Sequence, residues 1–178
     1  MMKKTVKAAA MVLLLTVATG NLFKAKAQEE DKSKRPSPPA TAMAKVGSAN
    51  VTINYGQPSV KGREIWGKLV PYGQVWRTGA NEATTFETDK DIRVQGKVLP
   101  AGKYGFFTVP GEKEWTIVFN KVPNQWGAFK YDQAQDYMRV TAKPKKSAKF
   151  NEKLLYTVNS KGWVSIDWEN LDVSFKVE

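Results

Sequence analysis

The sequence predicts an all-β protein, folded as a single antiparallel β-sandwich with a jelly-roll-like arrangement of strands. Apolar and polar residues alternate with a period of two in several short runs, and glycine or asparagine stands between neighbouring runs. The period of these runs is two residues and not the 3.6 residues of an amphipathic helix. Nine or ten short strands, with one helical turn near residues 63–69 or 132–136, would account for the chain and fit this class of fold.

The alternation is clearest in five segments. In the first, Val51, Ile53 and Tyr55 alternate with Thr52 and Asn54. Such a pattern lets the apolar side chains face a core while the polar ones face water. The five segments are 51–55, 115–119, 138–143, 164–168 and 173–177.

Residues that favour tight turns lie between the predicted strands. Gln95-Gly96 and Lys161-Gly162 each separate two strand-like runs, and Glu169-Asn170 precedes the last run. Glycine and asparagine accept the positive φ that two-residue hairpin turns require. We therefore predict three hairpins at these positions.

The N-terminus has the features of a secretory signal peptide. Three lysines within the first seven residues precede an apolar run over 8–18, and Ala25-Lys26-Ala27 places small residues where a signal peptidase cleaves. The apolar run is shorter than the about 20 residues that span a bilayer. We therefore expect no transmembrane segment, removal of residues 1–27 after Ala27, and a periplasmic mature protein. The alternative is an uncleaved anchor.

Residues 28–40 (QEEDKSKRPSPPA) are charged and proline-rich and include no large aliphatic residue. This composition predicts a disordered linker, which leaves 41–178 for the folded domain. The full chain has a net charge of +11, and residues 1–27 carry five lysines and no acids, so the mature chain is at 11 − 5 = +6. This modest charge predicts no binding to nucleic acid.

The chain contains no cysteine and no histidine. Their absence excludes disulfides and a lipid-anchored cysteine, and it also excludes Ser-His-Asp triads, Cys-His pairs and ordinary zinc sites. We expect neither a metal nor a cofactor. Any catalysis would depend on carboxylates, tyrosine, lysine or a Ser-Lys pair.

The most unusual segment, Pro71–Thr85, brings aromatic, cationic, amide and carboxylate side chains together within fifteen residues. Pro71-Tyr72-Gly73 predicts a turn, because proline fixes φ ahead of a flexible glycine. A second turn is predicted at Gly79–Asn81. Arg77 and Glu82 flank this second turn, so their side chains can pair across it.

Several runs around this segment carry a family resemblance. They are GQPSVKGR (56–63), IWGKLVPYG (65–73), VWRTGANEAT (75–84) and LPAGKYGFFTVP (99–110), followed by Trp115 and Trp126-Gly127. With the signature LVPYG-x-VWRTGANEAT, the chain resembles an exported bacterial family described only as domain of unknown function 2911. The resemblance covers essentially the whole mature domain. It implies a compact β-domain in the envelope of Bacteroidetes-like organisms and implies no activity or catalytic residue.

Two interpretations of the Pro71–Thr85 segment are open. In the structural one, Arg77 and Glu82 form an ion pair that fixes a loop, with Asn81 capping the backbone. In the functional one, the same three residues form the polar floor of a cleft with aromatic walls. Separately, Lys61 and Arg63 are either solvated loop charges, which is the expectation, or hold an anion. The candidate ligand-binding residues are then Arg63, Trp66, Tyr72, Trp76, Arg77, Asn81 and Glu82.

The predicted function is that of a non-catalytic module that binds a polar ligand, such as a glycan or a cell-wall fragment. The alternative is a histidine-independent carboxylate hydrolase with Glu82 as one acid and Glu64, Glu87 or Asp132 as the second. A third possibility is a structural envelope protein with a protein partner, which would expose a flat apolar patch. Trp126 is expected to pack as a lid over the sandwich, with a stacking platform as the alternative.

Overall fold

The computed structural model describes residues 31–178, so the predicted signal peptide (1–27) lies outside the described residues. This part of the chain folds as ten strands and two short 3₁₀-helices. No helix within it is long and apolar enough to cross a membrane. The strands are β1 (Pro39–Val46), β2 (Ala49–Gly56), β3 (Thr84–Thr88), β4 (Ile92–Val94), β5 (Lys97–Leu99), β6 (Gly102–Val109), β7 (Trp115–Asn120), β8 (Asp136–Ala142), β9 (Pro144–Val158) and β10 (Trp163–Lys176), and the helices are η1 (Lys32–Lys34) and η2 (Gln133–Gln135).

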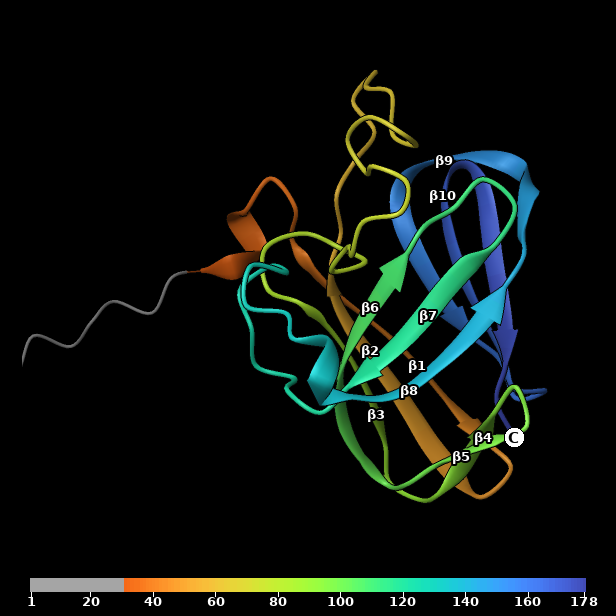
Figure 1. Cartoon of the computed structure of the whole chain (residues 1–178). Helices are drawn as coiled ribbons and strands as arrows, with labels where there is room; N and C mark the ends of the chain where they lie inside the picture. The colour runs from red at the N-terminus through yellow and green to blue at the C-terminus, as the bar shows by residue number, and fades with distance from the viewer. Residues whose placement is uncertain (1–30) are drawn as a thin grey trace, which may run out of the picture. The chain divides into compact units, whose positions relative to one another are not determined.

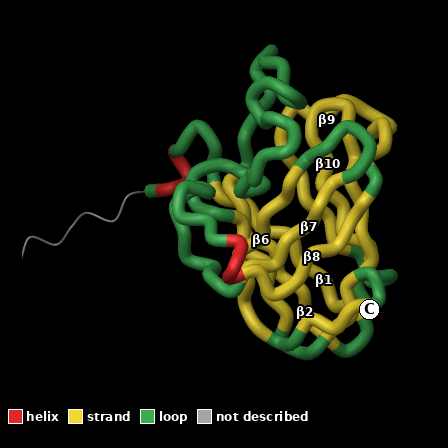
Figure 2. The backbone as a smooth tube through the Cα atoms, in the orientation of Figure 1, coloured by secondary structure: helices red, strands yellow, loops and turns green. Residues whose placement is uncertain are grey.

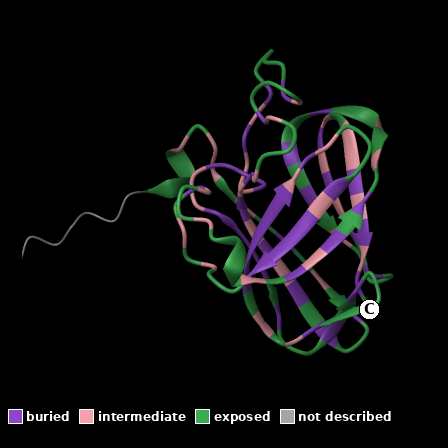
Figure 3. Ribbon diagram, viewed as in Figure 1, coloured by how far each residue is buried: buried purple, intermediate pink, exposed green. Residues whose placement is uncertain are grey.

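The strands form two layers, which confirms the all-β sandwich. Six strands make an antiparallel sheet in the order β1-β2-β3-β6-β7-β8, and β9 pairs with β10 behind it (Figure 1). Aromatic rings join the layers: Phe106 stacks on Phe175 with centroids 5.9 Å apart, and Tyr55 contacts Tyr156 at 4.6 Å. The buried residues follow the strands, while most exposed ones lie in the connecting loops (Figures 2 and 3).

Strand β10 reverses direction at the predicted turn, where Glu169 has a φ of 55°. Ser165 Oγ lies 3.0 Å from Ser174 Oγ, although the two residues are nine positions apart. A straight strand would separate them by about 30 Å. Across the same turn, burial together with the charge of Asp172 raises the pKa of Asp167 to about 6. These contacts confirm the reversal before the last strand.

The other two predicted hairpins are also confirmed. Gln95-Gly96 connects β4 with β5, and Lys161-Gly162 lies in the connection between β9 and β10. Of the two positions predicted for a helical turn, the second, 132–136, contains the helix η2. Asp132 caps this helix by accepting a hydrogen bond from Ala134 N (2.9 Å).

The N-terminal segment differs from the prediction. The sequence predicts a disordered linker over 28–40, yet residues 31–40 are ordered, and Pro39 already pairs with β2. Ahead of this strand, Asn81 Nδ2 donates a hydrogen bond to Ser37 O at 2.9 Å. Ala40 packs against the core, and the residues before it are held by polar contacts that hydrophobic patterning cannot reveal.

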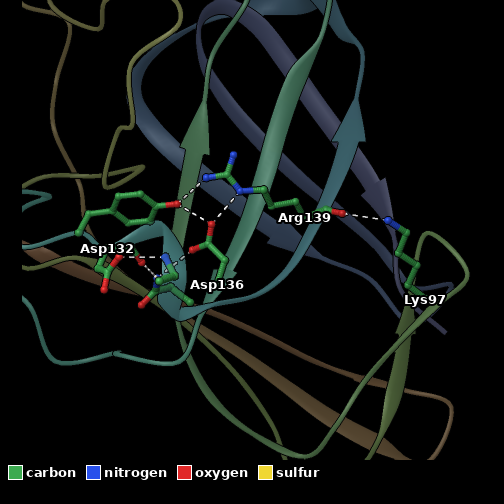
Figure 4. Close-up of polar contacts among 7 residues, drawn as sticks. Lys97, Asp132, Asp136 and Arg139 are labelled. Atoms are coloured by element: carbon green, nitrogen blue, oxygen red, sulfur yellow. Dashed lines mark hydrogen bonds and ion pairs between the residues drawn. The ribbon is translucent and has the colours of Figure 1, made fainter.

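The β4–β5 hairpin covers the outer edge of β8. Lys97 Nζ donates to Arg139 O at 3.1 Å (Figure 4), and Gln95 Nε2 donates to Thr141 O at 3.2 Å. Because these carbonyl groups are already bonded, this edge is protected against pairing with a strand of another chain. A ligand that adds a strand at this edge is therefore disfavoured.

Candidate functional site

The loop between Trp76 and Thr84 is held by a strained residue at its base. Thr78 has a φ of 52°, which is uncommon for a β-branched residue. Its carbonyl oxygen accepts hydrogen bonds from Tyr156 Oη (2.7 Å) and Thr84 Oγ1 (3.0 Å). Its own hydroxyl group bonds to Thr108 Oγ1 at 3.0 Å. The surrounding core therefore fixes the backbone from which the rest of the loop projects.

The tip of this loop pairs with a second loop that follows β7. Asn81 O accepts a hydrogen bond from Gly127 N (3.0 Å), and Ala83 N donates to Gln125 O (2.9 Å). Between these bonds, Glu82 forms an isolated β-bridge with Trp126. The pairing places a carboxylate-bearing residue opposite a tryptophan.

The second loop is anchored at its far end by a partly buried polar network. The side chains of Asp136 and Arg139 point toward one another (Figure 4), with Arg139 Nε 2.7 Å from Asp136 Oδ2. Tyr131 Oη donates to the same oxygen at 2.6 Å and accepts from Arg139. Burial and the bond to Asp136 raise the pKa of Tyr131 to about 12. This network fixes the loop that carries Trp126.

Glu82 is bound by two cations from the N-terminal segment. Lys32 Nζ lies 2.9 Å from Glu82 Oε1, and Arg35 Nη1 lies 3.1 Å from Oε1 and 2.9 Å from Oε2. Partial burial raises the pKa of Glu82, but the hydrogen bonds from Lys32 and Arg35 outweigh it and lower that pKa to about 2. Glu82 is therefore ionised at any physiological pH.

Two adjoining hollows meet at Glu82 on the outer face of the main sheet, the face turned away from β9 and β10. They have volumes of about 300 and 320 Å³ and share Glu82, Ala83 and Thr85, so we describe them as one outer groove. It is lined by Lys32, Arg35, Pro39, Ala40, Thr41, Asn54, Tyr55, Gly56, Asn81, Glu82, Ala83, Thr85, Lys103, Pro123, Asn124, Gln125 and Trp126. Within residues 31–178, no group of three or more carboxylates is placed to hold a metal ion.

The floor of the outer groove is a row of polar side chains. Thr41, Asn54 and Thr85 are in register across β1, β2 and β3, and Thr41 Oγ1 donates to Asn54 Oδ1 at 2.7 Å. Thr85 Oγ1 is buried and has no hydrogen-bond partner within residues 31–178, and the same holds for Gln125 Oε1. Buried polar atoms rarely lack a hydrogen-bond partner, so each of these two oxygens needs an explanation.

Trp126 forms an aromatic wall of the outer groove. Trp126 is 57% exposed, and the guanidinium carbon of Arg35 lies 5.8 Å from the centroid of the indole ring. A further hollow of about 320 Å³ continues past Trp126 to Phe129. The predicted lid over the sandwich is therefore wrong, because the tryptophan ring is open to solvent at the groove.

The predicted pair between Arg77 and Glu82 is also wrong. Glu82 binds Lys32 and Arg35 instead, and Arg77 Nε is buried with no hydrogen-bond partner among the described residues. Burial lowers the pKa of Arg77. Arg77 is not among the residues that line the outer groove.

Trp66 and Trp76, predicted as walls of the site, belong to the core. Trp76 is 9% exposed and stacks on Trp168 with centroids 5.8 Å apart. Trp66 lies edge-on to Trp115 at 5.1 Å and to Trp76 at 5.9 Å. These four rings form one cluster, in which Trp76 is buried and cannot stack on a ligand, while Trp66 is partly buried and does not line the outer groove.

Tyr72 and Arg63 likewise do not line the outer groove. Tyr72 is partly exposed, and its ring lies against Gly67 within its own loop. Arg63 donates hydrogen bonds to the carbonyl oxygens of Ser59 and Val60 and so closes a local turn. Of the seven predicted site residues, the outer groove brings together only Asn81 and Glu82.

Most residues of the outer groove cannot be predicted from the sequence. Lys32 and Arg35 lie in the segment predicted to be disordered, and no feature of the sequence marks Lys103 or Gln125 as a site residue. The one available signal was the alternation itself, because Asn54 and Thr85 lie at positions that face away from the core. Only the pairing of β2 with β3 shows that these positions are neighbours.

We expect a double-mutant cycle to show that Glu82 interacts with Arg35 in the folded protein. Replacing Arg35 and Glu82 by alanine, singly and together, should reveal a coupling of about 0.5–1 kcal/mol at pH 7, because one partner is half exposed. The pKa of Glu82 is lowered from 4.5 to about 2. This stabilisation is therefore present above pH 4.5 and is lost as the pH falls through 2. The matched cycle with Arg77 in place of Arg35 should show no coupling, and the reverse result would restore the predicted pair.

Comparison with known proteins assigns the chain to a family. Residues 37–177 match the model of the family described as "Protein of unknown function (DUF2911)". The chain belongs to this family, as its resemblance predicts. Searches of curated proteins and of solved structures found no match.

Proposed function

We propose that this member of the family is an exported, periplasmic protein that binds a glycan or cell-wall fragment in the outer groove without converting it. One observation carries the proposal. Thr85 Oγ1 and Gln125 Oε1 are buried without partners in the wall and floor of a groove that also contains the exposed ring of Trp126. An aromatic face beside fixed polar groups is a typical arrangement for binding a polar organic ligand.

The two unpartnered oxygens favour a ligand rich in hydroxyl groups. A buried acceptor without a hydrogen bond costs about 1–3 kcal/mol, and a donor from the ligand would recover that cost once a small rotation of the side chain turned its oxygen into the groove. Gln125 Oε1 can only accept a bond, whereas Thr85 Oγ1 can donate or accept one. Sugar hydroxyl groups supply both kinds of partner.

The groove supports binding better than two-carboxylate hydrolysis. Glu82 is the only carboxylate among the lining residues of the two hollows, and Glu64, Glu87 and Asp132 are not among them. With its pKa lowered to about 2, Glu82 does not hold the proton that a general acid must deliver. The export part of the proposal is supported by the lysine-rich start and the A-x-A motif at residues 25–27.

The test compares two exposed tryptophans that each lie near a cation. Trp126 is near Arg35 at 5.8 Å, and Trp163, on β10, is near Lys176 at 5.9 Å. On a glycan array, wild-type protein is expected to bind at least one glycan class. Trp126→Ala should weaken that binding about tenfold or more, while Trp163→Ala leaves it unchanged.

Two outcomes would contradict the proposal. One is the absence of any glycan binding by wild-type protein. The other is an equal loss of affinity in both tryptophan variants. Thr85→Val adds a second check, because it removes an unpartnered hydroxyl group while conserving shape, and it should weaken glycan binding without lowering stability.

A further inference from the structure

We propose that the outer groove prefers glycans that carry a protonated amine, and that Lys32 occupies the place of this amine on Glu82 until such a ligand binds. The inference rests on the proposed glycan-binding function and specifies its ligand class. It also assigns a regulatory role to the segment that precedes β1. Four observations support it.

The first observation is that Lys32 is held weakly. The helix η1 buries none of its residues, and the Lys32 side chain is 54% exposed. An ion pair this exposed contributes little, because water and salt compete for both charges. Lys32 can therefore leave Glu82 without loss of core packing.

The second observation is that Arg35 can stay when Lys32 leaves. Its side chain is only 14% exposed, and its Nη1 contacts both oxygens of Glu82. An ionised carboxylate offers about four lone-pair positions, so the bond from Lys32 to Oε1 occupies a separate position. A ligand ammonium group can take that position while Arg35 keeps the carboxylate oriented.

The third observation concerns the charge balance of the groove. The other lining cation, Lys103, is paired with Glu87 at 3.6 Å. Exchange of the Lys32 ammonium for a ligand ammonium leaves the charge around Glu82 and Arg35 unchanged. A neutral sugar would instead have to bind beside Lys32 or replace an ionic bond with a weaker neutral one.

The fourth observation is the position of Trp126. Glu82 and Trp126 are paired in a β-bridge, and both line the same hollow. A carboxylate beside an exposed indole ring suits a ligand with a cationic group attached to a body that can stack. An amino sugar has both parts.

Calorimetric titration of purified protein with two tetrasaccharides tests the inference. The probes are the glucosamine tetramer and the N-acetylglucosamine tetramer, at about pH 5.5, where amino groups are protonated. Wild-type protein should bind the glucosamine tetramer at least about fivefold more tightly. Lys32→Met should strengthen that binding by about two- to fivefold and leave binding of the acetylated tetramer unchanged.

Two control variants make the result specific. Lys34→Met removes a neighbouring lysine that pairs with Asp31 and should change neither affinity. Glu82→Gln should abolish the preference for the amine. Equal binding of the two tetramers by wild-type protein, or weaker glucosamine binding by Lys32→Met, would overturn the inference and leave glycan binding itself intact. Failure of every variant to bind either tetramer would also overturn it, and the glycan array then decides the proposed function separately.

Discussion

Replacement of Trp76 by alanine is expected to lower the free energy of unfolding by about 3–5 kcal/mol. The ring is almost fully buried and contacts Trp66, Trp115 and Trp168 at centroid distances of 5.9, 6.3 and 5.8 Å. Its removal leaves a cavity among rings that cannot collapse into the space. For a folded domain of this size, the midpoint of thermal unfolding should fall by about 6–20 °C.

Trp163→Ala is the matched control for this loss. Trp163 is 47% exposed, so its removal should cost about 1 kcal/mol or less. Both variants are measured by chemical and thermal unfolding. A Trp76→Ala protein with wild-type stability would contradict the assignment of this tryptophan to the core and return it to the set of candidate ligand contacts.

Gly56→Ala is expected to cost about 3 kcal/mol or more and to disturb the groove at the same time. A Cβ atom on this residue would overlap the carbonyl oxygen of Ala80 and lie 3.3 Å from its Cα atom. Backbone atoms cannot move aside as a flexible side chain can, so the loop that carries Asn81 and Glu82 must shift. Unfolding measurements give the loss of stability. A weaker coupling energy between Arg35 and Glu82 in the Gly56→Ala protein would report the shift of the loop.

Gly47→Ala provides the control for a glycine substitution without overlap. Gly47 has a φ of 58°, and an added Cβ would meet no atom within 4 Å. The substitution should cost about 1–2 kcal/mol from backbone strain alone and should leave the groove intact. If Gly56→Ala were no more destabilising than Gly47→Ala, the close packing of the loop on β2 would be refuted.

Much of the fold could be predicted because its signals are local. The alternation around Ile53 and Ile117 identifies two strands by itself, and a glycine or asparagine marks each hairpin turn. Sequence patterning could not detect the ordering of the segment before β1. That segment is held by contacts to Asn81 and Glu82, which are more than forty residues away along the chain.

Only part of the candidate site can be predicted from the sequence, because residues that are close in sequence need not be close in space. Arg77 and Glu82 are five residues apart, but the positive φ of Thr78 and of Asn81 (63°) turns the loop so that their side chains do not meet. Trp76 lies in the same motif and points into the core. The tryptophan of the Pro71–Thr85 segment therefore has a structural role. The exposed ring at the groove belongs to Trp126, which lies in a different loop.

Mapping of backbone amide chemical shifts during titration with the tightest-binding glycan tests the central claim most directly. The largest changes are expected on residues 79–85 and 123–127, with smaller changes at Thr41 and Asn54 on the floor of the groove. Residues 65–76, around the tryptophan cluster, should change little. Changes confined to that cluster, or to the face formed by β9 and β10, would show that the ligand binds elsewhere and would contradict the assignment of the outer groove.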